Sequence, residues 1–338
     1  MKKLTQTLKN IWSIEELRSK ILVTLLLIFI YRIGSHIVLP GIDPNKLALD
    51  KNNEGMLGLI NSFAGGAFNQ ASILALGIMP YISASIFMQL MTVLVPSFAK
   101  LQKEGESGRK KINQWTRYLT VAVTLVQASA YVGYLKTMTA NSGAITTALS
   151  ATQFWLITVT LLTAGTLFVM WLGEKITDKG LGNGTSLIIM VGILGRLPSN
   201  FVQELTSKSV RTGQILIFII EIAILIAIIM GCILLVQGTR RIAVNYAKQI
   251  VGNRQVGGGA RQYLPIKVNS AGVMPIIFAQ AIMFLPTLFF LNKAATSGFA
   301  DVFSDHRNFG YMAIYSAVVI GFTFLYTALI FNPKQIAD

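Results

Sequence analysis

The sequence predicts an all-α polytopic membrane protein, and three observations support this fold class. Hydrophobic residues make up 53% of the 338 residues, charged residues make up only 13%, and the mean hydropathy is +0.59. The apolar residues also form long continuous runs rather than alternating patterns. Because a hydrocarbon core of about 30 Å requires about 20 helical residues, such runs indicate transmembrane helices and not the strands of a barrel.

Eight apolar runs are long enough to be predicted as spans. The fifth has only about 15 residues, so tilting or burial would have to accommodate it. The predicted spans are residues 21–39, 71–95, 118–135, 153–173, 184–198, 214–237, 270–291 and 311–331.

The stretch GLINSFAGGAFNQ, residues 58–70, stands directly before the second predicted span. It is apolar but too short to cross a bilayer, and its Gly65–Gly66 pair weakens any helix by roughly 1 kcal/mol per glycine. The stretch therefore predicts a broken half-helix or a re-entrant segment.

Basic residues are distributed unequally between the loops. The loops on the side of the N-terminus carry 20 Lys and Arg residues, and those on the other side carry 8. By the positive-inside rule both termini are expected in the cytoplasm, and the net charge of +15 needs no nucleic acid to explain it. Ser13 and Glu16 have the spacing of a capping box, which predicts a short amphipathic helix on the cytoplasmic face.

The sequence contains no motif that predicts an enzyme, a metal site or a cofactor. Its one cysteine, Cys232, lies in an apolar run. GLGNG, residues 180–184, follows a span rather than a strand, so a tight turn is expected there.

Two ionisable residues, Arg32 and Glu221, fall within spans. The structural interpretation has Arg32 reaching outward and Glu221 pairing with a basic group such as Arg196. The alternative, an ion or proton relay, would need more carboxylates than one.

The loop at residues 238–269 carries six basic and no acidic residues. RRIAVNYA has a strand-like period, VGGGARQ supplies a turn, and YLPIKV returns, which predicts a basic β-hairpin. Such a hairpin would attract an anionic partner such as ribosomal RNA. The alternative is that its charges only hold the topology. The basic residues proposed to bind a partner are Arg240, Arg241, Lys248, Arg254 and Arg261.

Seven motifs together resemble the bacterial SecY family, the core of the protein-translocation channel. They follow the family's order from Arg32 to the end of the chain, namely RIGSHIVLPGID, ASILALGIMPYISASIFMQLMTV, KEGESGRKKINQWTRY, WLGEKITDKGLGNGTSLII, RRIAVNYAK, LPIKVNSAGVMPIIFA and YTALIFNP. The resemblance implies two inverted halves of five helices. Residues 1–198 would be the complete first half, and residues 199–338 would hold three spans of the second. The chain therefore resembles the family truncated after its eighth helix, with eight of ten spans present.

The resemblance implies functional residues at three places. The segment at residues 56–69 would be the plug that closes the pore, and its apolar and glycine positions are Leu57, Leu59, Ile60, Phe63, Gly65, Gly66 and Phe68. The hydrophobic pore ring would contain Ile78, Ile82, Thr185, Ile189 and Ile277. The lateral gate would include Gln89, Gln127 and Pro275.

Thr185 departs from the apolar residue usual at its position in the ring. Its hydroxyl would be placed in a dry constriction, unless it bonds to a carbonyl one turn back or lies at the periphery.

The expected function is that of the central subunit of the Sec translocon in the bacterial cytoplasmic membrane. It would pass unfolded secretory polypeptides across the membrane and membrane segments sideways into lipid. The partners implied by the resemblance are SecE, SecG, the SecA motor ATPase, the ribosome, YidC, nascent polypeptides and membrane lipids. Two other classes remain as alternatives, a secondary transporter and a non-conducting fragment or assembly factor.

Overall fold

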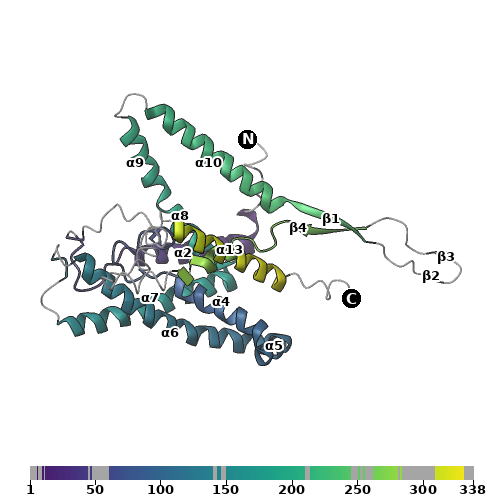
Figure 1. Cartoon of the computed structure of the whole chain (residues 1–338), viewed down its shortest axis with the longest axis horizontal. Helices are drawn as coiled ribbons and strands as arrows, with labels where there is room; N and C mark the ends of the chain where they lie inside the picture. Colours follow the sequence, from purple (N-terminus) through teal and green to yellow (C-terminus); the bar gives the residue numbers. More distant parts are fainter. Residues whose placement is uncertain are drawn as a thin grey trace. The chain divides into compact units, whose positions relative to one another are not determined.

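The computed structural model is built mainly from helices (Figure 1). It describes residues 6, 10, 12–44, 46–47, 61–139, 143–145, 150–209, 214–244, 250–251, 254–255, 262–280, 282–283 and 309–330. Within these ranges, five helices are long and apolar enough to cross a membrane, or six if one bent pair forms a single span. The predicted fold class, an all-α multi-pass membrane protein, is confirmed.

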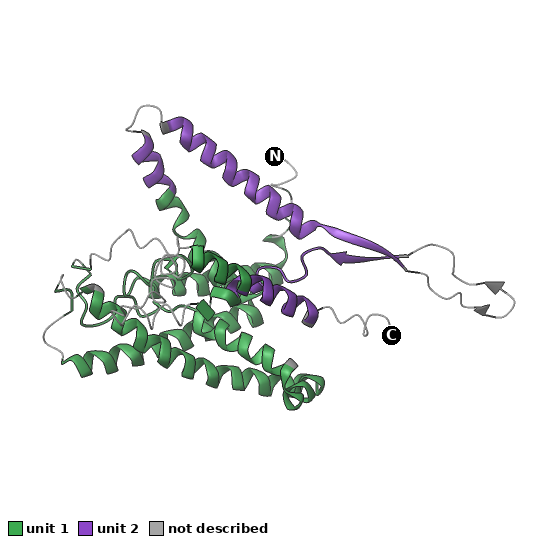
Figure 2. Cartoon of the chain, viewed as in Figure 1, with its two compact units in different colours: residues 1–200, 278–317 green, residues 201–277, 318–338 purple. Residues whose placement is uncertain are grey.

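The chain divides into two compact units, coloured green and purple in Figure 2. Unit 1 contains residues 1–200 and 278–317, and unit 2 contains residues 201–277 and 318–338. Each unit is described by itself below.

Unit 1 is a bundle of packed helices. Within it α6 packs against α4 and α7, α7 packs against α2 and α8, and α5 lies against α4 and α6. The helices are α2 (Glu15–Gly34), α4 (Met79–Leu94), α5 (Pro96–Lys103), α6 (Glu106–Thr139), α7 (Ala151–Lys179) and α8 (Gly184–Leu194).

The predicted capping box at the start of α2 is wrong. The N-cap residue is Ile14, and no side chain caps the helix. Ser13 lies one position too early, and its Oγ donates to the Asn10 carbonyl at 2.7 Å. Glu16 instead pairs with Lys20 one turn further along, at 2.8 Å.

The second span is shorter than predicted, because α4 begins at Met79 and not at residue 71. Residues 64–71 and 73–78 form turns. Ala71 and Gly77 have φ values of 45° and 54°, in the left-handed region that a right-handed helix cannot contain. Pro80 in the first turn of α4 supplies a favourable helix start, since its missing N–H would have no partner there.

The fifth span is longer than the 15 residues predicted. After α8, a turn at Gly195–Arg196 leads into α9 (Leu197–Ser209), and an apolar segment of 25 residues runs from Gly184 to Lys208. The polar residues of α9 predict a loop, but several of their side chains donate hydrogen bonds to carbonyl groups one turn earlier in the chain. Thr206 Oγ1, for example, donates to the Val202 carbonyl at 2.9 Å.

Unit 2 contains most of α9, α10 (Gln214–Gln237) and a β-hairpin. The hairpin strands β1 (Thr239–Val244) and β4 (Gln262–Lys267) pair antiparallel, with Thr239 opposite Lys267 and Val244 opposite Gln262. Two short strands, β2 (Ile250–Val251) and β3 (Arg254–Gln255), pair further out. The predicted β-hairpin is therefore confirmed.

Helix α13 (Phe309–Ile330) contributes to both units. It corresponds to the last predicted span, and α10 corresponds to the sixth. Of the seventh predicted span, residues 274–280 and 282–283 are helical, and residues 281 and 284–291 lie outside the described residues.

Candidate functional site

The candidate site of unit 1 is the segment at residues 61–78, which we call the turn segment. Only residues 61–63 of it are helical, and most of the remainder forms turns. It pairs with the chain that follows α2, because the Leu39 N–H donates to the Ala71 carbonyl and the Ile73 N–H donates to the Ile37 carbonyl, both at 2.9 Å. Three of the predicted plug residues, Leu57, Leu59 and Ile60, lie outside the described residues.

Glycines of two helices bring those helices against the backbone of the turn segment. A Cβ added at Gly165 of α7 would lie 2.3 Å from the Ile73 carbonyl oxygen. A Cβ added at Gly192 of α8 would lie 2.4 Å from the Phe63 carbonyl oxygen. Real Cβ atoms do not approach carbonyl oxygens so closely, so the approach of these helices at these two points requires glycine.

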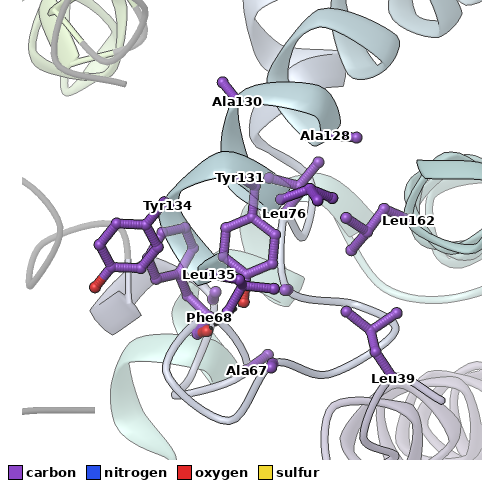
Figure 3. Close-up of a cluster of buried hydrophobic side chains, with 14 of the residues drawn as sticks. Leu39, Ala67, Phe68, Leu76, Ala128, Ala130, Tyr131, Tyr134, Leu135 and Leu162 are labelled. Atoms are coloured by element: carbon purple, nitrogen blue, oxygen red, sulfur yellow. Dashed lines mark hydrogen bonds between the residues drawn. The ribbon is translucent and has the colours of Figure 1, made fainter. Parts of the chain in front are cut away.

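Phe68 anchors the turn segment in the core of unit 1 (Figure 3). Its side chain is fully buried, with ring centroids 4.7 Å from Tyr131 and 5.6 Å from Tyr134. Tyr131 also donates its hydroxyl to the Phe68 carbonyl at 2.6 Å. The two tyrosines of α6 therefore hold both the side chain and the main chain of Phe68, one of the predicted plug residues.

Asn61 stabilises the turn segment from within. Its side-chain Oδ1 accepts the Asn69 N–H at 3.0 Å, and its carbonyl accepts the Gly66 N–H at 2.8 Å. Two buried oxygens of the same segment, Asn69 Oδ1 and Ser72 Oγ, have no hydrogen-bond partner among the described residues. The segment is thus closely packed while some of its polar groups remain unsatisfied.

Four of the five predicted ring residues belong to unit 1. Ile78 is the N-cap residue of α4, Ile82 lies in its first turn, and both are buried. Thr185 and Ile189 lie in the first two turns of α8. The fifth, Ile277, belongs to unit 2 and lies in the helical residues 274–280.

Two of these residues meet at a glycine of α7. A Cβ added at Gly173 would lie 3.2 Å from Thr185 Cγ2 and 3.5 Å from Ile78 Cδ1. Ile188, which the sequence analysis did not assign to the ring, approaches the same point at 3.6 Å. The starts of α4 and α8 are therefore packed together at Gly173.

Thr185 has a polar environment. Its Oγ1 donates to Asn183 Oδ1 at 2.6 Å, and the same oxygen accepts the Thr185 N–H as the N-cap of α8. Of the two alternatives for Thr185, the bond to a carbonyl one turn back is therefore wrong, because the hydroxyl donates to the capping side chain of Asn183 instead.

The Thr185 side chain also lines a polar cavity of about 330 Å³ between α4, α6, α7 and α8. On its wall, Arg117 forms a bidentate ion pair with Glu174, with N–O distances of 2.6 and 3.2 Å. The Thr185 hydroxyl is thus hydrogen-bonded to Asn183, and its methyl group packs beside Gly173, where Ile78 also lies.

The predicted gate residues have different surroundings. Gln127 of α6 is buried, and its Oε1 has no hydrogen-bond partner among the described residues. Gln89 of α4 is exposed and lines a smaller cavity of about 210 Å³ between α4, α5 and α6. Pro275 belongs to unit 2. Their role in a gate stays a prediction.

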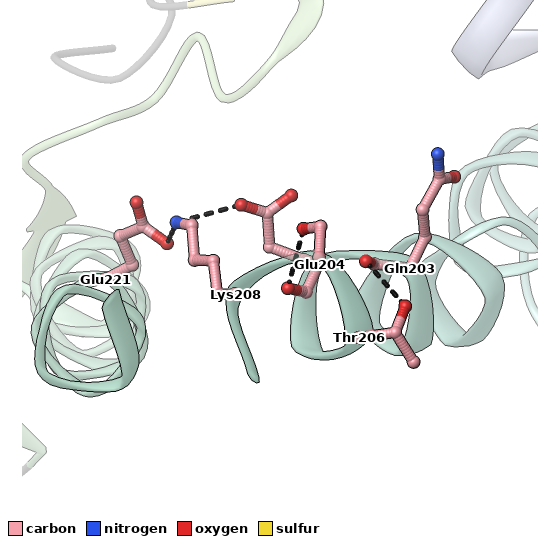
Figure 4. A network of polar contacts seen from close by, with 6 residues as sticks. Gln203, Glu204, Thr206, Lys208 and Glu221 are labelled. Atoms are coloured by element: carbon pink, nitrogen blue, oxygen red, sulfur yellow. Dashed lines mark hydrogen bonds and ion pairs between the residues drawn. The ribbon is translucent and has the colours of Figure 1, made fainter. Parts of the chain in front are cut away.

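The sequence predicts that Glu221 pairs with a basic group such as Arg196. In the structure, Glu221 pairs with a different basic residue. In unit 2, Lys208 of α9 forms ion pairs with both Glu221 of α10 and Glu204 of its own helix, the latter at 2.8 Å (Figure 4). Lys208 lies in the last turn of α9, and its side chain reaches Glu221 of α10. Glu221 is therefore explained as a structural ion pair.

Replacing Lys208 with Met is expected to change the free energy of unfolding only slightly, because the Glu221 side chain is 50% exposed and its charge is partly screened by water. A double-mutant cycle with Glu221→Gln would measure the coupling between the two charges. Glu204→Gln is the matched control on the second ion pair. A strong coupling between Lys208 and Glu221 would show that this pair lies in a poorly solvated environment.

The first strand of the hairpin presents two arginines to solvent. Arg240 and Arg241 are both exposed, and they point to opposite faces because they are neighbours in β1. Arg254 is described only as part of the strand β3, and Lys248 and Arg261 lie outside the described residues. No group of three His, Cys, Asp or Glu side chains that could hold a metal occurs in the described ranges.

Comparisons with known proteins agree on one family. The profile of the SecY family matches residues 72–338. Protein translocase subunit SecY of Pseudomonas aeruginosa is 44% identical over 345 residues, covering 96% of this chain and 74% of that protein. The same subunit of Aquifex aeolicus is 41% identical over 342 residues, covering 99% of this chain and 79% of that protein.

Solved structures show the same fold. A structure of a protein-conducting channel matches with a TM-score of 0.58 at 18% identity, covering 92% of this chain and 71% of that one. A second structure, concerned with the plug domain of the SecY protein, matches with a TM-score of 0.60 at 18% identity, covering 95% and 74%. The canine Sec61 channel in a ribosome-channel complex matches with a TM-score of 0.54 at 18% identity, covering 95% and 75%.

Proposed function

The chain belongs to the SecY family, and we propose that it is the central pore-forming subunit of a Sec translocon. In this role it passes unfolded secretory polypeptides across a bacterial cytoplasmic membrane and releases membrane segments sideways into lipid. Both termini lie in the cytoplasm, in keeping with the 20 basic residues of the loops on that side against 8 on the other. The observation that carries the proposal is the turn segment, which is packed inside unit 1 although it contains little regular structure.

The turn segment acts as the plug of the closed channel. A plug must be held firmly without substrate and must leave its site at moderate cost. The buried Phe68 side chain supplies the first property. The unsatisfied Asn69 Oδ1 and Ser72 Oγ support the second, because buried polar groups without partners lower the cost of moving to water.

The pore ring is formed by Ile78, Ile82, Thr185, Ile189 and Ile277. Aliphatic side chains suit any polypeptide, since apolar contact is not directional. They also exclude water and ions when they are in contact with one another. Thr185 fits this role because its hydroxyl is bonded to Asn183 and its methyl group faces Gly173.

The lateral gate includes Gln89, Gln127 and Pro275. SecE and SecG are the companion subunits, and SecA or a translating ribosome supplies the driving force. The basic hairpin is the docking element for these cytoplasmic partners, which its exposed Arg240 and Arg241 support. The canine Sec61 neighbour was solved in a ribosome-channel complex, which is consistent with this assignment.

Photo-crosslinking tests the pore directly. A photo-reactive residue in place of Ile78 is expected to label a stalled secretory polypeptide strongly. Ile224 of α10 is the matched control, since it is the same residue type in an apolar helix and is 54% exposed. Equal labelling at both positions, or none at Ile78, would contradict a central pore and favour a transporter or a non-conducting role.

Charge reversal tests the hairpin. Arg240→Glu and Arg241→Glu change the loop charge equally, but they alter opposite faces. If the hairpin docks a ribosome through one face, one reversal should weaken ribosome affinity roughly tenfold, the loss expected for one charge-assisted contact, and the other should change it little. Unchanged affinity in both variants would leave topology as the only role of these charges.

A further inference from the structure

We propose that Arg32 and Arg196 are positioning residues that together hold the plug in its closed position, because their guanidinium groups lie against the main chain at Gly65–Gly66. This inference rests on the proposed function of the turn segment. From the sequence, Arg32 is expected to reach toward the surface and Arg196 to be one possible partner of Glu221. In the structure, the Arg32 guanidinium lies against Gly65 and the Arg196 guanidinium lies against Gly66, all within unit 1.

Arg32 contacts two parts of the chain at once. Its Nη1 lies 3.5 Å from the Gly65 carbonyl oxygen. A Cβ added at Gly65 would lie 2.8 Å from the same nitrogen, and one added at Gly195 would lie 2.8 Å from Arg32 Cζ. The guanidinium therefore fills the space between the turn segment and the end of α8.

Arg196 covers the neighbouring glycine. A Cβ added at Gly66 would lie 2.7 Å from Arg196 Nε and 3.0 Å from its Cζ. Gly65 and Gly66 have φ values of 65° and 95°, which L-residues rarely adopt. Glycine is therefore required at both positions for two reasons. The backbone conformation favours it, and each arginine approaches too closely to leave room for a Cβ atom.

The local electrostatics explain how two like charges are held here. Arg32 lies in the last turn of α2, and Gly195, against which it packs, is the C-cap residue of α8. The carbonyl ends of helices attract cations. Within the described ranges, neither arginine forms an ion pair with a carboxylate. The Arg32 guanidinium therefore depends on a carbonyl oxygen that the turn segment supplies at Gly65, and the Arg196 guanidinium lies against the main chain at Gly66.

This arrangement fixes the turn segment at one position and still allows it to leave. When the turn segment leaves, Arg32 exchanges one carbonyl partner for water, and no buried carboxylate is left unpaired. Removing either guanidinium should therefore loosen the plug in the absence of substrate while leaving the remainder of the channel intact.

The test is the accessibility of a cysteine in the turn segment. Ala67 is fully buried, so Ala67→Cys in a Cys232→Ser background should react slowly with a membrane-impermeant maleimide in proteoliposomes. Arg32→Gln removes one charge-assisted contact and is expected to raise that rate roughly tenfold. Arg196→Gln removes the group that covers Gly66 and is expected to raise the rate as well. Lys46→Gln is the matched control, because Lys46 is an exposed cation of the loop before the turn segment.

Two further measurements distinguish a failure of the positioning role of the arginines from a failure of the plug assignment itself. Arg32→Lys keeps the charge and should retain part of the protection, whereas a variant that merely unfolds would lose its thermal transition. If a stalled secretory polypeptide speeds labelling but both glutamine variants react at the parental rate, the positioning role is wrong and the plug stands. If the stalled polypeptide leaves the labelling of the parental protein unchanged, the plug assignment itself is wrong.

Discussion

Gly165→Ala is expected to push α7 away from the turn segment and to destabilise unit 1. The added methyl carbon would lie 2.3 Å from the Ile73 carbonyl oxygen and 3.1 Å from a methyl group of Leu74. The first atom belongs to the backbone, so it cannot rotate aside as a side chain would. Overpacking of this kind costs about 1–3 kcal/mol and sometimes more. The free energy of unfolding should fall by at least this amount.

The matched control for this substitution is Gly231→Ala in α10. A Cβ added at Gly231 meets no atom within 4 Å, so only the helix propensity changes. Alanine is favoured over glycine in a helix by roughly 1 kcal/mol, and the control should be neutral or slightly more stable. Thermal unfolding in detergent, followed by tryptophan fluorescence, would compare the two. Equal stability of both variants would show that α7 can move away from the turn segment without cost.

The helices and the hairpin could be predicted because their signals are local. An apolar run such as residues 214–237 contains enough information to specify a span, and α10 matches it closely. The hairpin also follows from local patterns, since the strand period of RRIAVNYA and the returning YLPIKV lie close in the chain. These elements needed no knowledge of their neighbours.

The break at Gly65–Gly66 could be predicted, but the conformation of the second half of the turn segment could not, because it depends on distant residues. Residues 71–78 belong to an apolar run that continues into α4, and composition alone favours one long helix. Contacts with Gly165 and with the strand-like residues after α2 override that preference. A glycine within an apolar helix gives no sign of which backbone it will meet.

The sequence also does not identify which residues form ion pairs or hydrogen bonds with individual polar side chains. Glu221 pairs with a basic residue as predicted, but not with Arg196, because three basic residues, Arg196, Lys208 and Arg211, precede it in the same region and the sequence does not distinguish among them. In the structure, the last turn of α9 carries Lys208, and this residue forms the ion pair with Glu221. In the same way, Thr185 bonds to the capping side chain of Asn183, which becomes a cap only once α8 has a defined start.

Phe68→Ala is expected to release the plug, and comparison with Tyr131→Phe separates side-chain packing from hydrogen bonding. Phe68 is fully buried between Tyr131 and Tyr134, so truncating it removes a whole aromatic ring from the core. Such truncations cost about 3–5 kcal/mol. Tyr131→Phe keeps the ring and removes only the hydroxyl that donates to the Phe68 carbonyl, a loss of about 1 kcal/mol.

The two variants should therefore differ in channel leak as well as in stability. In planar bilayers without substrate, Phe68→Ala should open an ion conductance, because the plug loses the side chain that anchors it in unit 1. Tyr131→Phe should leave the bilayer nearly sealed, since the aromatic contact at 4.7 Å remains. If Tyr131→Phe leaked as much as Phe68→Ala, the hydrogen bond to the main chain would be the principal anchor. If neither leaked, the ring of aliphatic side chains would have to seal the channel without the plug, and Phe68 would be a residue of the core only.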